Sequence, residues 1–307
     1  MSVSTFHVMT LFPEMFDALR TSVLGRAEGA GIIGLKTYQI RDFSADPRHK
    51  NVDDYTYGGG AGLLMMCQPI FDCYKEVMRV VEEENTNQNE KKNNSLSNSD
   101  VESIGMTKEI FGAESDDEVV ESSNVENKPS GFAETIADLV QIENKNFGTR
   151  ILYPTPQGIP FTQEIARDLA QAKDIVILCG RYEGVDERVL DAMNVERYCL
   201  GDYVLTGGEL PAMTIIDCVS RLIPGVLHND DSPETESFDN GLLEYPQYTR
   251  PATWSPEEGT EMHVPEILLS GDHGAVDQWR LEQQLERTRR WRPDLYEVYL
   301  KNMGEKS

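Results

Sequence analysis

The sequence predicts an α/β protein with a mostly parallel sheet that helices cover on both faces. Short apolar runs rich in β-branched residues predict strands at residues 6–12, 32–40, 150–153, 174–179 and 195–200. Helical patterns separate these runs, and this alternation is typical of parallel sheets. Two of the runs end in Gly180 and Gly201 and open into polar loops. Ligands bind at the carboxyl ends of such strands, so the sequence predicts a pocket there.

The sequence also predicts helices between these strands. Pro13 comes directly after the first strand, and its missing N–H costs least at the start of a helix. An amphipathic pattern predicts a helix at 68–81. Later helices are predicted at residues 161–172, 186–193 and 209–222, and the last of these ends shortly before Pro224.

Between residues 82 and 146 neither the strand pattern nor the helix pattern is present. The segment is rich in asparagine, serine and glutamate, and it carries nearly half of the chain's net charge of −25. This composition predicts a disordered acidic insertion, with a transient helix at the apolar patch 132–142. Decoration of the fold is the first interpretation of the insertion, and a partner-binding segment is the second.

Composition also limits the class of protein. A chain of 307 residues suffices for about two domains, which we place at 1–227 and 242–307, with a polar linker at 228–241. No apolar run approaches the roughly 20 residues that span a bilayer, so no membrane partner is expected. The N-terminus lacks the basic flank of a secretory signal. Five scattered cysteines without CxxC spacing indicate reduced thiols and a cytoplasmic location.

Eight blocks of sequence carry a more specific likeness. They are LFPEMF at 11–16, RDFSADPRHKNVDDYTYGGGAGLLMMCQP at 41–69, YPTPQG at 153–158, CGRYEGVDERV at 179–189, LGDYVLTGGELPAM at 200–213, SRLIPGVL at 220–227, GLLEYPQYTRP at 241–251, and LLSGDH with QWRLEQ within 268–283. In this order they resemble the bacterial tRNA (guanine-N1)-methyltransferases of the SPOUT class, which methylate guanine-37, the base 3′ of the anticodon. The acidic insertion departs from the compact form of that family.

The resemblance implies a SPOUT-type parallel sheet with a deep trefoil knot, plus a small C-terminal helical domain. It implies that the loops of the knot bind S-adenosylmethionine and that the C-terminal domain grips the anticodon stem-loop of tRNA. A homodimer with composite active sites is implied as well. Knots are nearly absent from protein folds, so the knot is expected from the resemblance alone.

By the same resemblance, three glycine-bearing loops form the S-adenosylmethionine pocket. Glycine lets backbone N–H and C=O groups approach adenine and ribose closely, because no Cβ intervenes. The matching residues are Tyr153, Pro154, Thr155, Pro156, Gly180, Leu200, Gly201, Asp202, Tyr203, Val204, Leu205, Gly207 and Gly208. The glycines at 58–60 lack the spacing and the lysine of a phosphate-binding loop. The resemblance places them near the target nucleotide.

Methylation at guanine N1 requires loss of the N1 proton and stabilisation of negative charge on O6. The linker aspartate of the family is replaced here by Glu236, the expected base, although its extra methylene moves the carboxylate; Asp239 is the rival. Arg221 matches the arginine expected to stabilise O6 or to orient the carboxylate of the base, and its alternative role is to complement a helix dipole. Glu183 matches a carboxylate near the guanine. The resemblance also implies Mg²⁺, whose ligands the sequence does not identify.

The C-terminal section is locally basic and aromatic, with Arg280, Arg287, Arg289, Arg290, Arg292, Trp279 and Trp291. Arginine contacts to phosphate and aromatic stacking hold exposed RNA loops. Ion pairs with Glu282 and Glu286 along the same helix are the alternative. By resemblance, the block at 41–69, with Arg48, His49 and Asp53, faces the anticodon region.

Two other functions stay open. One is a SPOUT-class RNA methyltransferase with a different target base, against which the linker block and the arginine-rich C-terminus argue. The other is a catalytically silent RNA-binding or regulatory protein that keeps the fold, against which the cofactor loops and Arg221 argue. We therefore expect an S-adenosylmethionine-dependent tRNA (guanine(37)-N1)-methyltransferase.

Overall fold

The central feature of the fold is a five-stranded parallel sheet in the order β2–β1–β6–β5–β7. The computed structural model describes residues 4–60, 62–99, 148–227, 237–238, 241–257 and 259–304, and side chains outside 88–99. The strands are β1 (Ser4–Thr10), β2 (Ile33–Gln39), β5 (Thr149–Pro160), β6 (Asp174–Leu178) and β7 (Glu196–Cys199). The predicted α/β class with a parallel sheet is confirmed.

The strand β6 shows why these sequences form a sheet buried on both faces. All five of its residues are buried, as the continuous apolar run predicts. Its side chains alternate between two cores: Ile175 and Ile177 pack into one, and Val176 and Leu178 pack into the other. A period of two residues therefore divides one apolar run between the two faces.

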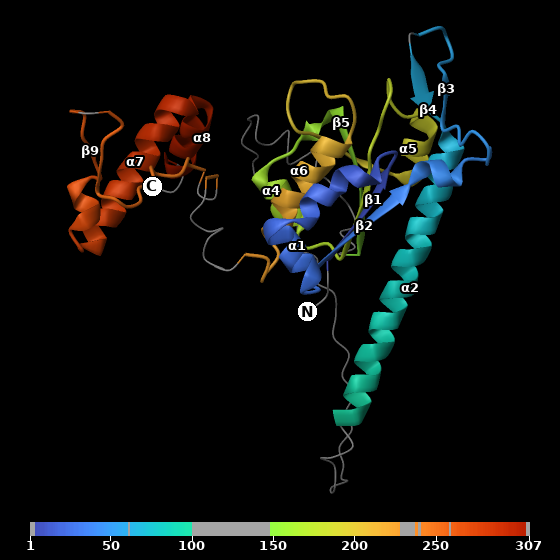
Figure 1. The fold of residues 1–307 in the computed structure, drawn as a ribbon, viewed down its shortest axis with the longest axis horizontal. Coiled ribbons are helices and arrows are strands. Elements are labelled where there is room, and N and C mark those ends of the chain that lie inside the picture. The colour runs from blue at the N-terminus through green and yellow to red at the C-terminus, as the bar shows by residue number, and fades with distance from the viewer. Residues whose placement is uncertain are drawn as a thin grey trace, which may run out of the picture.

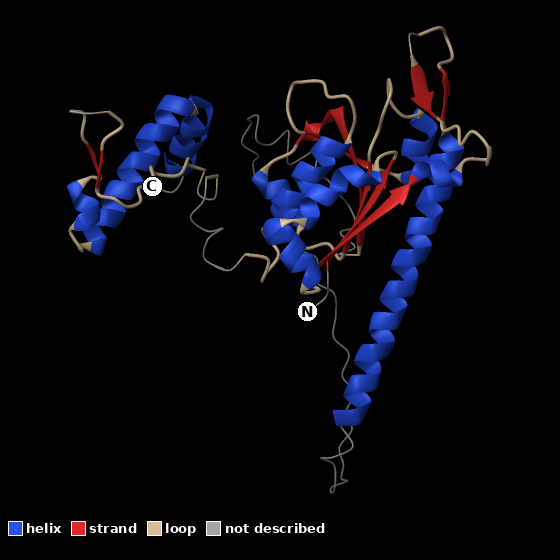
Figure 2. Cartoon of the chain, in the orientation of Figure 1, coloured by secondary structure: helices blue, strands red, loops and turns tan. Residues whose placement is uncertain are grey.

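Helices cover both faces of the sheet (Figure 2). One face is covered by the 3₁₀ helix η1 (Pro13–Arg20), α1 (Ser22–Gly29), α4 (Gln163–Leu169) and α6 (Glu209–Ser220). The other face is covered by α2 (Cys67–Ser99) and α5 (Glu187–Met193). The last of the predicted helices, α6, begins at the predicted residue and is buried along its apolar side.

Helix α2 continues well beyond its predicted end at residue 81 and projects from the sheet (Figure 1). The prediction of disorder is therefore wrong for residues 82–99. Tertiary contacts hold the first turn of this extension: Glu84 forms an ion pair with Lys36 of β2, and Asn85 Nδ2 lies 3.5 Å from Asp174 Oδ2 of β6. The remainder of the predicted insertion, including the patch 132–142, lies outside the described residues.

A hairpin that the sequence analysis did not predict stands beside the sheet. Its strands are β3 (Asp53–Tyr55) and β4 (Leu63–Met65), and it follows the short 3₁₀ helix η2 (Ile40–Phe43). Gly58 and Gly59 have φ angles of +84° and +76°, so they make the turn of the hairpin.

The C-terminal section contains β8 (Thr253–Trp254), β9 (Met262–His263), the 3₁₀ helix η4 (Glu266–Leu269), α7 (His273–Trp291) and α8 (Pro293–Gly304). These elements are drawn in orange and red in Figure 1. The two helices pack on each other, and the N–H of Leu243 donates to Thr288 Oγ1 at 2.8 Å. The boundaries of the predicted domains stay predictions.

All five cysteines are free thiols. In the part of the chain that the structure describes, no helix is long and apolar enough to cross a membrane.

Candidate cofactor pocket

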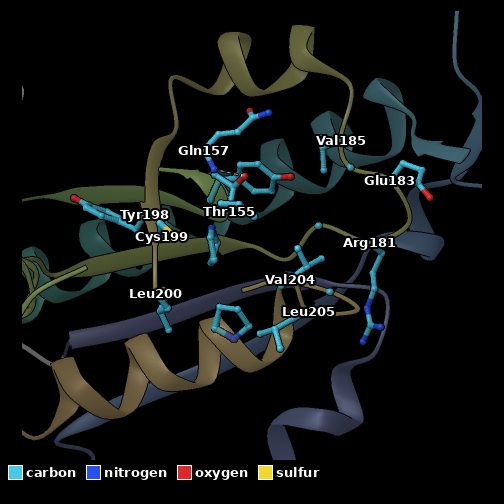
Figure 3. Close-up of a pocket in the computed structure, with 18 of the residues that line it drawn as sticks. Thr155, Gln157, Arg181, Glu183, Val185, Tyr198, Cys199, Leu200, Val204 and Leu205 are labelled. Atoms are coloured by element: carbon cyan, nitrogen blue, oxygen red, sulfur yellow. Dashed lines mark hydrogen bonds between the residues drawn. The ribbon is translucent and has the colours of Figure 1, made fainter. Parts of the chain in front are cut away.

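A cavity of about 370 Å³ opens at the carboxyl ends of β5, β6 and β7 (Figure 3). Its walls come mainly from three places: residues 153–157 of β5, residues 180–185 and Glu187 after β6, and residues 198–201 and 203–208 around the end of β7. This is the edge of the sheet where the two glycine-terminated strand patterns predict a ligand.

The cavity brings together nearly all residues expected to bind the cofactor. Those that line it are Tyr153, Pro154, Thr155, Pro156, Gly180, Leu200, Gly201, Tyr203, Val204, Leu205, Gly207 and Gly208. Asp202 is not among the lining residues. Glu183, expected near the target base, lines the same cavity.

An irregularity in β5 shapes one wall. Both Pro154 and Ile159 pair with Tyr198 of β7, so residues 155–158 bulge out of the ladder toward the cavity. Gly158 permits the bulge, because a Cβ there would lie 2.4 Å from the backbone nitrogen of Tyr198. Proline on either side of Thr155 cannot donate to a neighbouring strand. The motif YPTPQG thus encodes the wall, a signal that the strand prediction ending at residue 153 missed.

Tyr153 and Gly180 meet behind this wall. A Cβ on Gly180 would lie 2.9 Å from Tyr153 Oη, so the ring packs against a glycine. Burial raises the pKa of Tyr153, and the phenol therefore stays protonated at neutral pH. It provides a rigid apolar surface and a hydroxyl group that can still donate a hydrogen bond.

A buried ion pair between Arg181 and Glu209, which the sequence analysis did not single out, supports the cavity. Glu209 is fully buried, and its Oε1 accepts a hydrogen bond from Thr10 Oγ1 at 2.8 Å. Its Oε2 lies 2.8 Å from Arg181 Nε, in ion-pair contact without hydrogen-bond alignment. Arg181 also covers the ring of Phe12 at 4.4 Å and donates to the carbonyl of Thr206 at 3.2 Å. The guanidinium is therefore neutralised and held in place beside the loop after β7 (Figure 3).

The hairpin is tied to the wall that follows β6. The N–H of Glu183 donates to the Leu63 carbonyl at 3.0 Å, and the N–H of Met65 donates to the Gly184 carbonyl at 3.0 Å. Tyr182 adopts a φ of +61°, which is uncommon for a bulky residue, and its hydroxyl accepts from Arg41 at 3.2 Å. Hydrogen bonds therefore fix the block at 41–69 against the wall of the cavity.

Comparison with known proteins assigns this arrangement to a family. The family model of tRNA (Guanine-1)-methyltransferase TrmD matches residues 4–111 and 132–298, which include every residue that lines the cavity. The chain belongs to this family. The resemblance inferred from the eight blocks is thereby confirmed.

Three relatives named tRNA (guanine-N(1)-)-methyltransferase illustrate the similarity. The protein of Lachnospira eligens is 42% identical over 301 residues, which cover 98% of either chain. The protein of Lachnoclostridium phytofermentans is 41% identical over 98% of this chain and 94% of its own. That of Clostridioides difficile is 40% identical over 95% of this chain and 96% of its own. The Lachnospira protein is thus of nearly the same length, and this length therefore occurs in another member of the TrmD family.

The expected catalytic residues do not all lie at the cavity. Arg221 caps the C-terminal end of α6, while Gly208 at its N-terminal end lines the cavity. A helix of twelve residues is about 18 Å long, so the two ends are far apart within one chain. Glu236 and its rival Asp239 both lie outside the described residues.

The carboxylates at the cavity are few. Glu183 and Glu187 line it, and Glu187 forms an ion pair with Arg197. Over the described ranges, no cluster of three or more His, Cys, Asp or Glu residues could hold a metal ion. Mg²⁺ is often bound through only one or two carboxylates together with water and substrate oxygens. Glu183 is therefore the carboxylate of this cavity that fits such a role.

Proposed function

We propose that the protein transfers the methyl group of S-adenosylmethionine to N1 of guanine-37 in tRNA. The observation that carries the proposal is the convergence of three family loops on one cavity, in a chain that belongs to the TrmD family. A cavity of about 370 Å³ falls in the range of roughly 300–1,000 Å³ that is usual for small-molecule sites.

The lining of the cavity fits S-adenosylmethionine. Gly180, Gly201 and Gly207 line the cavity, and their backbone groups are proposed to bond the polar edges of adenine and ribose. Leu200 and Val204 offer apolar contact to the adenine faces. When bound, the cofactor supplies an electrophilic methyl group, and the protein supplies its position.

The residues expected from the resemblance are proposed to remove the proton and to stabilise the developing charge. Glu236 is proposed to remove the proton from N1, and Arg221 to stabilise the negative charge that develops on O6. Glu183 is proposed to lie near the guanine and to contribute to binding of Mg²⁺. No step of this proposal depends on the metal.

A homodimer with composite sites is part of this proposal, and the position of Arg221 supports it. Arg221 caps the end of α6 remote from the cavity, so we propose that a second copy of the chain brings it to the reacting base. Exposed side chains that a partner could cover line the cavity or lie in the first turn of α6: Val204 is 88% exposed, Tyr203 56% and Leu210 49%. The deep trefoil knot belongs to the same proposal, with the packed loops after β6 and β7 as its support.

The C-terminal section is proposed to be a tRNA-binding helical domain that acts on the anticodon stem-loop. Its support is the cluster of arginines on α7 together with exposed Trp291. The RNA substrate and the reduced cysteines favour a cytoplasmic location.

The test is transfer of labelled methyl from S-adenosylmethionine to an unmodified tRNA transcript, compared with the same transcript carrying adenine at position 37. We expect transfer to the guanine transcript only. Transfer to both would indicate a SPOUT enzyme with another target base. Cofactor binding without transfer to either would favour the catalytically silent RNA-binding protein.

A further inference from the structure

A second, smaller cavity of about 260 Å³ lies in the C-terminal section. It is formed by two family blocks that meet in space: Tyr245 and Tyr248 come from the segment after the linker, and His273, Trp279 and Arg280 come from α7. Its volume is below the roughly 300–1,000 Å³ of sites for whole small-molecule ligands. It therefore has the size for one flat ring system rather than for a complete cofactor.

The walls of this cavity are aromatic. The rings of Tyr248 and Trp279 lie 6.4 Å apart and are tilted by 51°, so they form an open angle instead of a closed stack. Tyr248 is 47% exposed, which leaves ring surface available to a ligand. Tyrosine and tryptophan faces are the surfaces on which unpaired nucleobases stack.

Arg280 adds an unused hydrogen-bond donor. Its guanidinium lies 5.0 Å from the centre of the Tyr245 ring, and its Nη1 donates to Asp277 at 3.0 Å. Its Nε is buried, and among the described residues it has no hydrogen-bond partner. A buried N–H without an acceptor is costly, so a bound acceptor would be favoured there.

The local charges distinguish a base from a phosphate. Asp277 already neutralises Arg280, and Glu244 accepts a hydrogen bond from Gln247 at 2.5 Å beside the same cavity. Two carboxylates repel the negative charge of a backbone phosphate, whereas a neutral ring with acceptor atoms meets no such repulsion. The cavity therefore suits the uncharged part of a nucleotide.

We propose that this cavity holds one unstacked nucleobase of the RNA substrate, stacked on the exposed ring surface of Tyr248 beside Trp279, with Arg280 Nε donating to a ring acceptor. The inference rests on the proposed function, which supplies an RNA with an exposed loop. It goes further in assigning Trp279 and Arg280 to recognition of a base, while the other arginines of α7 are left to contact phosphate.

The experiment uses Trp279 as its own reporter. The chain has three tryptophans, so Trp254→Phe with Trp291→Phe leaves Trp279 as the single tryptophan, and phenylalanine keeps an aromatic ring for the RNA contact proposed at residue 291. This protein is titrated with an unmodified anticodon stem-loop RNA and with a panel of the same RNA, each carrying one abasic position in the loop. We expect the intact RNA to quench the fluorescence and one abasic RNA to lose most of the quenching.

Affinity measurements on the full chain add an independent readout. Tyr248→Ala is expected to weaken RNA binding about 5- to 150-fold, as loss of one base stack does. The slope of log Kd against log salt should stay unchanged, because no phosphate contact is lost. Arg290→Gln, in contrast, should lower the slope by about 0.7 to 0.9. Leu269→Ala is the matched control, since Leu269 is exposed beside the cavity but does not line it.

The outcomes separate this proposal from the function it rests on. Normal RNA binding that is insensitive both to Tyr248→Ala and to every abasic position overturns the nucleobase site alone. A change of salt slope in Tyr248→Ala also overturns it, in favour of a phosphate contact. Quenching by free guanosine monophosphate but not by RNA would assign the cavity to a free nucleotide instead. Absence of RNA binding by the unmodified chain contradicts the proposed function itself.

Discussion

The backbone N–H of Gly208 donates a hydrogen bond of 2.8 Å to the carbonyl oxygen of Gly180. The bond joins the loop after β7 to the loop after β6, two walls of the candidate cofactor cavity. A Cβ on Gly208 would lie 2.9 Å from both the Cα of Cys179 and the nitrogen of Gly180. Backbone atoms cannot rotate out of the way as a side chain does, so glycine is required for this spacing of the walls.

Gly208→Ala should therefore separate the two walls and weaken cofactor binding. We expect the affinity for S-adenosylmethionine to fall about 5- to 150-fold, the equivalent of a typical overpacking penalty. Isothermal titration calorimetry measures the change. Gly29→Ala is the matched control, because a Cβ at Gly29 meets no atom within 4 Å. Equal affinities of Gly208→Ala and the unmodified protein would show that the wall spacing does not govern binding.

Arg181→Met should destabilise the fold, because it leaves the carboxylate of Glu209 buried without a cation. The expected loss is about 3–5 kcal/mol in the free energy of unfolding, measured by urea denaturation. The double variant Arg181→Met with Glu209→Gln removes the buried charge and should recover most of this loss. A single variant as stable as the double one would contradict the role given to the ion pair.

Removal of the acidic segment should depend on where the deletion begins. Asn85 contacts Asp174, whose N–H donates to the Gly148 carbonyl at 3.0 Å, so the chain at residue 85 lies close to the start of β5. Replacement of residues 88–145 by a short glycine–serine linker should keep methyl transfer and stability close to those of the full chain. Replacement of 82–145 also removes Glu84 and Asn85, and it should lower the midpoint of thermal unfolding.

Comparison of the two deletions by methyl transfer and by thermal unfolding tests this point. A large loss of activity in the 88–145 deletion would overturn the interpretation of the segment as decoration. Equal stability of both deletions would show that the contacts of Glu84 and Asn85 do not hold α2 to the sheet.

Glu236→Gln should leave S-adenosylmethionine binding unchanged and slow methyl transfer by about 10²- to 10⁴-fold, the usual contribution of a general base. Single-turnover transfer to the tRNA transcript measures the rate, and calorimetry measures cofactor binding. Asp239→Asn is the paired control and should retain activity. Full activity of Glu236→Gln together with loss in Asp239→Asn would assign the base to Asp239.

Asp186 should contribute pH-dependent stability as the N-cap of α5. Its carboxylate accepts from the Arg188 N–H at 3.0 Å and from the Arg188 guanidinium, and these bonds hold the pKa of Asp186 below its usual range. A lowered pKa in the folded state gives stability that is present above the unfolded value of about 3.9 and is lost as the pH falls through the folded value.

Asp186→Ala should accordingly cost about 0.5–2 kcal/mol at neutral pH, the usual value for loss of a cap. The difference from the unmodified protein should shrink as the pH falls below about 4, toward the folded pKa. Urea unfolding of the variant and the unmodified protein, at neutral pH and below pH 4, measures this difference in stability. A difference that is the same under the two conditions would show that the carboxylate does not act through its charge.

The sequence predicted the regular elements best where one local pattern was strong. The apolar run at 174–179 became β6 (Asp174–Leu178), and the helix expected from residue 209 became α6. The hairpin of β3 and β4 was missed because each strand has three residues, too few for a period to be visible. The prediction ended helix α2 at residue 81, where its apolar pattern stops, and the next turn contacts distant strands through Glu84 and Asn85 instead.

The candidate cavity also has some features that the sequence predicted and others that it did not. Its glycines and prolines were readable, because they stand in blocks shared with a family and restrict the backbone locally. Arg181 and Glu209 were missed although both stand in those blocks, since charged residues at such positions are usually exposed. Their pairing across the loops appears only once β6 and α6 are placed side by side.

The sequence by itself determined the α/β class, the carboxyl edge of the sheet as the place of the cavity, and the family. These depend on the period of apolar residues and on the backbone freedom of glycine and proline, which are local properties. Tertiary structure alone decided that Glu209 is buried against Arg181, that the hairpin of β3 and β4 is bonded to the cavity wall, and that Tyr248 and Trp279 frame a second cavity. Such relationships join residues far apart in the chain, and no local pattern encodes the distance between them.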